Sequence, residues 1–190
     1  MKHFILSFFV FFSLQLIFAQ YTYEPSEKYP FGRYNPEAPE QTKDFEALMG
    51  ECQCQSINRK KDQSWNEPED MIWRWKYIMN GTAVQDETLK ADGSHSGSIR
   101  QFDLDSLRWN VHYYSSAGIT TPLPTWHGTK KEGNIVLYRA QKAPNGMDGF
   151  YRLTFYDISE KGYKWIGEWV DTAEKIVYPT WKIECFRKED

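Results

Sequence analysis

The sequence predicts an all-β protein, an antiparallel up-and-down barrel of about ten strands with a short N-terminal helix. Apolar and polar residues alternate in short runs from Glu51 onward, which is typical of strands that bury one face. Turn-forming residues separate these runs and no helical segment interrupts them, so consecutive strands should pair as a meander. The chain also contains 8 Trp, 12 Tyr and 12 Phe, and aromatic residues favour strands. Closure into a barrel removes the exposed edges that an open sheet would have.

Length and charge narrow the class of protein. The 190 residues fit one domain and can bury a sizeable core. Lys plus Arg total 23 and Asp plus Glu total 26, so the net charge is -3. We therefore expect no binding to nucleic acid, because a slightly acidic chain lacks the positive field that attracts phosphate backbones.

Residues 1–19 are interpreted as a signal peptide. Lys2 and His3 give a short basic start, residues 4–18 are almost continuously apolar, and Ala19 supplies a small residue at the expected cleavage point. The apolar run is too short to span a bilayer, and no later stretch is apolar enough to do so. We therefore expect no membrane span and a secreted or periplasmic protein.

Residues 20–41 contain four prolines and little periodicity, so we expect an extended arm before a barrel domain of residues 42–190. The domain should begin with a short helix over Thr42–Met49, with Thr42 as its cap and Gly50 at its end.

Ten segments after this helix carry the alternating pattern of strands. They are Glu51–Asn58, Asp70–Asn80, Thr82–Lys90, His95–Phe102, Ser106–Ser116, Leu123–Thr129, Asn134–Gln141, Gly149–Ile158, Tyr163–Val170 and Ile176–Phe186. Asn80-Gly81, between the second and third segments, is the strongest hairpin signal in the chain.

The three cysteines, Cys52, Cys54 and Cys185, leave at least one thiol unpaired. Cys52 and Cys54 alternate on one strand and share a face, which makes a bond between them awkward. Either could reach Cys185 if the first and last strands are neighbours, as closure of a barrel requires. No nucleophile signature surrounds any of the three.

Several of these segments resemble an uncharacterised lipocalin-like (calycin-type) barrel family common in bacteria, over Thr42 to Arg187. The residues that carry the resemblance are Leu48-Met49-Gly50-Glu51, Asn80-Gly81-Thr82-Ala83, Phe155-Tyr156-Asp157-Ile158, Trp165 to Glu168 and Thr180-Trp181. The chain departs from the family at Cys52, where a Trp is expected. The resemblance implies an antiparallel lipocalin-like barrel with an internal or mouth-side pocket, and it implies no particular substrate.

More loosely, an exported and aromatic-rich member of this kind is similar to small accessory proteins that marine bacteria encode with polysaccharide-degrading enzymes. One such type is a dehydratase that acts on uronic-acid-ended oligosaccharides of ulvan. This second resemblance implies carbohydrate chemistry.

The residues that could carry chemistry are polar side chains on neighbouring strands, because the chain contains no P-loop, GxSxG, HExxH or CxxC motif. Period two places several of them on one face of four adjacent strands. They are His95, Arg108, His112, Tyr114, His127 and Tyr138.

Assumed turn lengths suggest which of these side chains face one another. A four-residue turn at Asp103–Ser106 would place Tyr114 opposite His95. A symmetric hairpin around Gly118–Thr120 would place His112 opposite His127, and a four-residue turn at Lys130–Gly133 would place Tyr138 opposite Thr125. Directly opposed side chains are near enough to interact.

Three interpretations of the set remain open. In the first, His112, His127 and Tyr114 transfer protons, Arg108 or Arg152 binds a carboxylate, and β-elimination on a uronic acid follows. In the second, three imidazoles bind zinc. In the third, these residues are solvated polar groups with no shared role.

The face that points inward is ambiguous. Trp109, Val111, Tyr113 and Trp126 resemble a core and would place the histidines outside, although Trp126 could also stack on a sugar. We expect His95, Tyr138 and Trp126 to contribute to substrate binding if the site is catalytic.

The sequence therefore favours an exported carbohydrate-active protein, a dehydratase or lyase on uronic-acid-containing oligosaccharides, without a cofactor or metal. The alternative is a non-enzymatic barrel that binds a small apolar ligand, or haem through one His. A fully packed interior would favour a third class, a structural or interaction domain.

Overall fold

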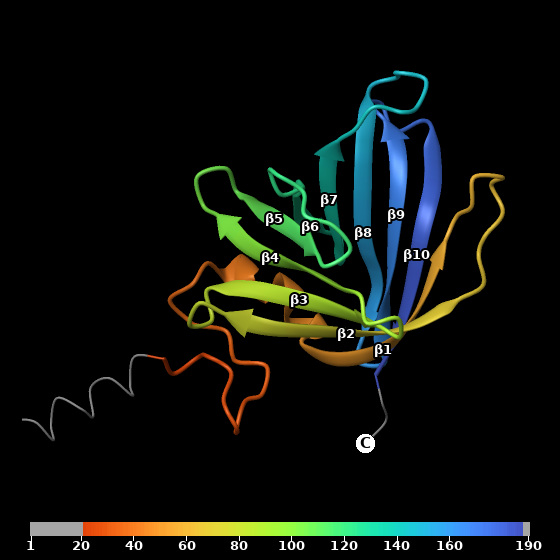
Figure 1. Ribbon diagram of the computed structural model, residues 1–190. Helices are drawn as coiled ribbons and strands as arrows, with labels where there is room; N and C mark the ends of the chain where they lie inside the picture. The colour runs from red at the N-terminus through yellow and green to blue at the C-terminus, as the bar shows by residue number, and fades with distance from the viewer. Residues whose placement is uncertain (1–20, 188–190) are drawn as a thin grey trace, which may run out of the picture.

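Ten antiparallel strands close into a barrel in the computed structural model, which describes residues 21–187 (Figure 1). The strands are β1 (Gly50–Asn58), β2 (Glu69–Ile78), β3 (Ala83–Lys90), β4 (His95–Asp103), β5 (Arg108–Ser115), β6 (Thr125–Lys131), β7 (Asn134–Ala140), β8 (Gly149–Ser159), β9 (Gly162–Asp171) and β10 (Val177–Phe186). The predicted fold class and all ten predicted strands are confirmed, with ends that differ by one or two residues at most. The predicted signal peptide lies outside the described residues.

Each strand pairs with the next along the chain, and β10 returns to pair with β1. In Figure 1, β8, β9 and β10 stand side by side as long strands, whereas β2, β3 and β4 cross them steeply and wrap around the other side. The closed barrel is consistent with the lipocalin-like build that the sequence suggested.

A disulfide between Cys54 and Cys185 joins the first and last strands. The two residues are direct cross-strand partners, with Cα atoms 4.0 Å apart. This register settles the pairing that the sequence left open, and Cys52 remains a buried free thiol. The bond lies on the inner face of the barrel, at the junction of β1 and β10, and it fixes the closure covalently.

One end of the barrel is covered by a 3-10 helix, η1 (Glu40–Leu48), whose Phe45 and Leu48 are fully buried. The helix begins two residues earlier than predicted, and Thr42 lies inside it with no cap hydrogen bond, so the predicted cap at Thr42 is wrong. A buried Thr side chain is unavailable to the free N–H groups at the helix start, where Pro39 stands instead. Arg187, just after β10, donates hydrogen bonds to the carbonyl groups of Met49 and Ala47.

The N-terminal arm packs against the turn between β2 and β3. The backbone N–H of Tyr23 donates to Asn80 Oδ1 at 3.1 Å, and that of Asn35 donates to the carbonyl group of Gly81 at 3.2 Å. Gly81 adopts a φ of 77°, and a Cβ there would lie 2.3 Å from the carbonyl oxygen of Arg33. The Asn80-Gly81 pair therefore forms the predicted turn and also receives the arm.

Aromatic side chains fill the barrel around one buried ion pair. Arg100 and Asp86 form this pair, and each side chain is only 4% exposed. Trp73 Nε1 donates a hydrogen bond to Asp86 at 2.8 Å, and the Arg100 guanidinium lies 4.4 Å from the ring centroid of Trp75. A buried charge without a partner would destabilise the folded state, so removal of either side chain alone should lower the free energy of unfolding.

We predict that Asp86→Asn lowers the free energy of unfolding by about 3 to 5 kcal/mol, because it leaves the Arg100 charge buried without a partner. The double variant Asp86→Leu, Arg100→Met should lose clearly less, because it removes both charges. Urea denaturation of the three proteins measures the difference. A double variant less stable than Asp86→Asn would contradict this account of the core.

Candidate functional site

The predicted histidine face is the outer face of the barrel wall. Trp109, Val111 and Trp126 point inward and are buried, so His112 and His127 point outward. Trp126 is only 7% exposed, and the Arg139 guanidinium lies 4.4 Å from its ring centroid. It therefore belongs to the core, as the sequence favoured, and its ring does not present an open face for a sugar.

The predicted residues do share one face, but the three predicted strand registers are each wrong by two residues. His112 faces Thr125 rather than His127, and His127 faces Asn110 on one side and Tyr138 on the other. Likewise, Tyr114 faces Gly97 rather than His95. A slip of two keeps every side chain on its face and changes only its neighbours.

Turn geometry explains two of these slips. The β4–β5 turn lies one residue later than expected, because Asp103 stays in β4 and its carboxylate accepts hydrogen bonds from Asp105 N–H and Ser106 Oγ. The β6–β7 turn has only two residues, Glu132 and Gly133, both with positive φ.

A continuous row of polar side chains crosses the outer wall where these strands meet. Its members are successive cross-strand partners on β4 to β9, so each lies beside the next. The row consists of Gln101, Asn110, His127, Tyr138, Arg152 and Glu168. It gathers three predicted site residues: His127, Tyr138 and Arg152.

The barrel wall opens beside this row. β6 and β7 pair only as far as His127 and Tyr138, although β6 begins at Thr125 and β7 continues to Ala140. A cleft of about 540 Å³ occupies the fork. We call it the outer-wall cleft; it is lined by Arg108, Thr125, His127, Gly128, Tyr138, Arg139, Ala140 and Phe150.

Gly128 allows the two strands to approach closely just before they diverge. A Cβ at this position would lie 1.9 Å from the carbonyl oxygen of Val136. Any other residue would push β6 away from β7 and change the shape of the cleft.

Hydrogen bonds fix the tautomer of both outer-wall histidines. Asn110 Oδ1 accepts at 2.7 Å from His127 Nδ1, which therefore carries the hydrogen. Thr125 Oγ1 donates to the carbonyl group of Leu123, so it accepts from His112 Nδ1 at 3.0 Å. In their neutral forms, both rings therefore keep a lone pair on Nε2, as a general base or a metal ligand requires.

The environment of His127 favours its neutral form. Burial lowers the pKa of the imidazole below its ordinary value, and the positive charges of Arg108 and His112 lower the pKa further. His127 therefore stays unprotonated, with Nε2 available as a base, down to a lower pH than a solvated histidine.

Two arginines, Arg108 and Arg139, line the cleft, and neither forms a close ion pair within residues 21–187. Arg108 is exposed and stands opposite the Asp103 carboxylate across the β4–β5 pair. Arg139 is half-buried; it donates to Gln141 Oε1 at 2.8 Å, and burial lowers its pKa. A partly buried cation without an ion-pair partner attracts an anion, so the Arg139 side of the cleft suits a negatively charged ligand.

Arg152, in contrast, is neutralised by protein carboxylates. It forms ion pairs with Glu168, at 2.8 Å, and with Glu174. The Tyr138 hydroxyl donates to Glu174 at 3.0 Å, and burial together with this carboxylate raises the pKa of Tyr138. Tyr138 and Arg152 also line a second hollow of about 420 Å³, beside the first.

The remaining predicted residues lie apart from the outer-wall cleft. Tyr114 packs over Gly97, and its hydroxyl accepts a hydrogen bond from Gln85 Nε2 at 2.7 Å. His95 is exposed at the start of β4, and His112 is not among the residues that line the cleft, although it bonds Thr125 at the rim and lowers the pKa of His127. No group of three side chains suitable for a metal occurs within residues 21–187, so the three histidines do not form the zinc site considered above.

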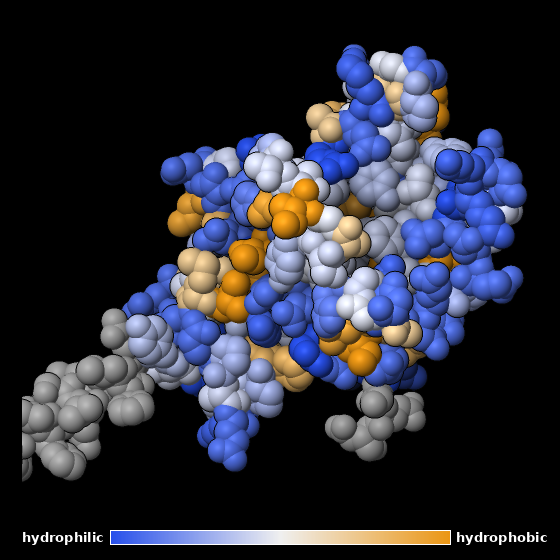
Figure 2. Space-filling model, in the orientation of Figure 1, coloured by the Kyte–Doolittle hydropathy of each residue, from blue (hydrophilic) through white to orange (hydrophobic). Residues whose placement is uncertain are grey.

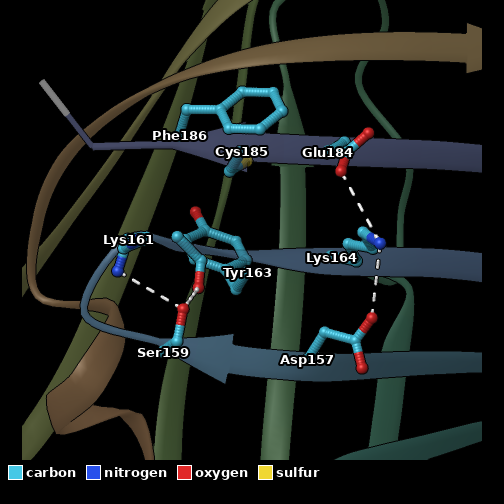
Figure 3. Close-up of a pocket in the computed structure, with 9 residues that line it drawn as sticks. Asp157, Ser159, Lys161, Tyr163, Lys164, Glu184, Cys185 and Phe186 are labelled. Atoms are coloured by element: carbon cyan, nitrogen blue, oxygen red, sulfur yellow. Dashed lines mark hydrogen bonds and ion pairs between the residues drawn. The ribbon is translucent and has the colours of Figure 1, made fainter.

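Other cavities are less suited to a ligand. A hollow of about 140 Å³ lies over β8, β9 and β10. In it, Lys164 lies between Asp157 and Glu184 (Figure 3), at 3.3 and 3.6 Å from their carboxylates. Lys164 and the two carboxylates neutralise one another, and Tyr163 is buried, with only 2% of its surface exposed. Inside the barrel, a cavity of only about 60 Å³ remains between Trp73, Asp86 and their neighbours.

No protein-family model matches the chain, and no curated protein matches it. Within residues 21–187, no helix is long and apolar enough to cross a membrane. On the face seen in Figure 2, hydrophobic residues form separate patches on a largely hydrophilic surface.

Sequence reasoning missed Arg139, Asn110 and Glu174. Arg139 follows Ile135 and Leu137 in the alternation that points into the barrel on β7. A charged residue at an inward position is unusual, and this could have marked Arg139 as a candidate site residue. Asn110 alternates with Arg108 and His112 on β5 and so shares their face, but only the observed register shows that it is the partner of His127. Glu174 lies in a turn, 36 residues from Tyr138, and no local pattern predicts that contact.

We predict that Arg108→Gln raises the pKa of His127, because the substitution removes a positive charge that disfavours the imidazolium form. The unprotonated base would then be lost at a higher pH as the solution is acidified. NMR titration of the His127 ring C–H signals measures this shift. Arg108→Lys keeps the charge and is the matched control; a pKa that stays constant in Arg108→Gln would disprove the coupling.

Proposed function

We propose that this protein is exported and acts on uronic-acid-containing oligosaccharides by β-elimination in the outer-wall cleft. One observation carries the proposal: two arginines, of which Arg139 is partly buried without an ion-pair partner in residues 21–187, share the cleft with His127, whose Nδ1 bonds Asn110 and so leaves a lone pair on Nε2. Such a site combines an anion receptor with a base, which is the combination that proton removal beside a carboxylate requires.

Each group has a defined role in the proposed reaction. Arg108 and Arg139 bind the uronate carboxylate and stabilise the negative charge that develops on it. His127 Nε2 removes the proton from the carbon next to the carboxylate. The electron pair of that C–H bond forms a carbon–carbon double bond as the adjacent carbon–oxygen bond breaks.

Tyr138 supplies the proton that the departing oxygen requires. A departing hydroxyl group leaves as water, which makes the reaction a dehydration; a departing glycosidic oxygen leaves as a sugar hydroxyl, which makes it a lyase reaction. His127 then returns its proton to the Tyr138 phenolate through solvent, and both groups regain their starting forms. His112 positions Thr125 at the rim of the cleft, and Tyr114 takes no part.

Two further features support the proposal. The Cys54–Cys185 disulfide is typical of proteins that work in an oxidising compartment, which agrees with export. The resemblance to dehydratases that act on ulvan oligosaccharides supports a uronic acid at the chain end as the substrate.

The small interior cavity argues against the alternative of a barrel that binds an apolar ligand or haem. Its volume of about 60 Å³ is far below that of ordinary ligand pockets, roughly 300 to 1,000 Å³. A packed interior also fits a structural domain, but a structural role does not explain why Arg139, partly buried and without an ion-pair partner in residues 21–187, lines a cleft beside His127.

We predict that the purified mature protein converts uronic-acid-ended oligosaccharides to products with the ultraviolet absorbance of a conjugated unsaturated uronate. Mass spectrometry would distinguish loss of water from chain cleavage. His127→Gln should lower kcat by about a hundredfold or more, because it removes the base. Arg139→Gln should mainly raise KM, because it weakens carboxylate binding.

Arg74→Gln is the matched control for the arginine variant. Arg74 lies on β2, where it pairs with Glu51 at 2.8 Å, away from the cleft. It should keep the activity of the unmodified protein. Full activity of His127→Gln would refute the residue assignment, and no absorbance change on a panel of polyuronates would refute the proposed reaction.

A further inference from the structure

Arg152 stands between two carboxylates that differ in how firmly the fold holds them. Glu168 is its direct cross-strand partner on β9, and the Glu168 side chain is 9% exposed. Glu174 comes from the turn between β9 and β10, and its side chain is 41% exposed. Glu168 is therefore a fixed part of the wall, whereas Glu174 can exchange with solvent.

The turn that carries Glu174 does not depend on the Glu174 side chain. The Asp171 carboxylate accepts hydrogen bonds from the N–H groups of Ile176, at 2.6 Å, and Ala173, at 3.3 Å. The N–H of Glu174 itself donates to the carbonyl group of Asp171 at 2.9 Å. The side chain is thus free to leave Arg152 without unfolding the turn.

Glu174 meets the two donors as a bound ligand carboxylate would. One of its oxygens accepts from the Tyr138 hydroxyl at 3.0 Å, and the other pairs with Arg152 Nη1. Replacement of this carboxylate by another leaves the charge of the group unchanged, so an exchange carries little electrostatic cost. A neutral sugar would leave Arg152 Nη1 without its anion.

The hollow beside these donors has room for a ligand. It measures about 420 Å³ and includes Val136, Thr154 and Tyr156 on its floor and walls. Tyr138 lines this hollow and the outer-wall cleft alike, so the two sites adjoin. An oligosaccharide bound in the cleft would place its neighbouring sugar here.

We infer that Arg152 is a second carboxylate-binding subsite, which Glu174 occupies in the unliganded protein and which the carboxylate of an adjoining uronic acid takes over. The inference deepens the proposed function and rests on it for the identity of the ligand. Departure of Glu174 also releases the Tyr138 hydroxyl, the group that donates the proton in the proposed reaction. Occupation of the second subsite would therefore prepare the first one for catalysis.

The test is an NMR titration with sodium glucuronate at constant ionic strength, which follows the side-chain Nε–H signals of Arg152, Arg108 and Arg139. Glu174→Gln should tighten glucuronate binding at Arg152 about fivefold, the effect of removing an exposed competing ion pair. Glu160→Gln, the same change in the remote β8–β9 turn, should leave it unaltered. The uncharged methyl ester of glucuronate should not shift the Arg152 signal in any of the proteins.

Unchanged or weaker glucuronate binding at Arg152 in Glu174→Gln would overturn the inference, and so would an equal response to the methyl ester. If Glu174→Gln does not fold, the unmodified protein still decides: its Arg152 signal must respond to glucuronate and not to the ester. If glucuronate shifts the Arg152 signal but not those of Arg108 and Arg139, the proposed function is refuted and the second subsite stands. If it shifts the signals of Arg108 and Arg139 but not that of Arg152, the second subsite is refuted and the proposed function stands.

Discussion

Pairing of β1 with β10 is the constraint on which the rest of the molecule depends. Once the sheet meets itself, alternate residues of each strand are assigned to the interior or to the outer wall, and a slip of one residue would exchange the two sets. The Cys54–Cys185 disulfide fixes this junction from inside. Arg187 fixes it at the closed end, where its hydrogen bonds tie the chain after β10 to the end of η1.

Closure also decides where a ligand can bind. The interior is taken up by large aromatic side chains around the Arg100–Asp86 pair, and the space left there is small. β6 and β7 separate beyond His127 and Tyr138, and the cleft lies at that fork in the outer wall. At the fork, Arg139, which belongs to the inward-facing residues of β7, lines the cleft together with the outward-facing His127 and Tyr138.

The ten strands and the grouping of the histidines on one face could be predicted because both follow from period-two alternation. That this face points outward could not, because apolar and aromatic residues occur on both faces of these strands. The neighbours of His127 could not, because register depends on turn length, and the Glu132–Gly133 turn is shorter than the sequence suggested. The separation of β6 from β7 could not be predicted either, because nothing in the sequence around Thr125 and Arg139 shows that these strands stop pairing there. The contact of Glu174 with Tyr138 joins a turn to a distant strand, and only the closed sheet brings them together.

The decisive measurement is a crystal structure of the protein with a bound uronic-acid-ended oligosaccharide. The terminal carboxylate should lie between the guanidinium groups of Arg108 and Arg139, with His127 Nε2 facing the carbon next to it. An oligosaccharide seated at the open end of the barrel, or on any face away from β6 and β7, would show that the outer-wall cleft is not the site.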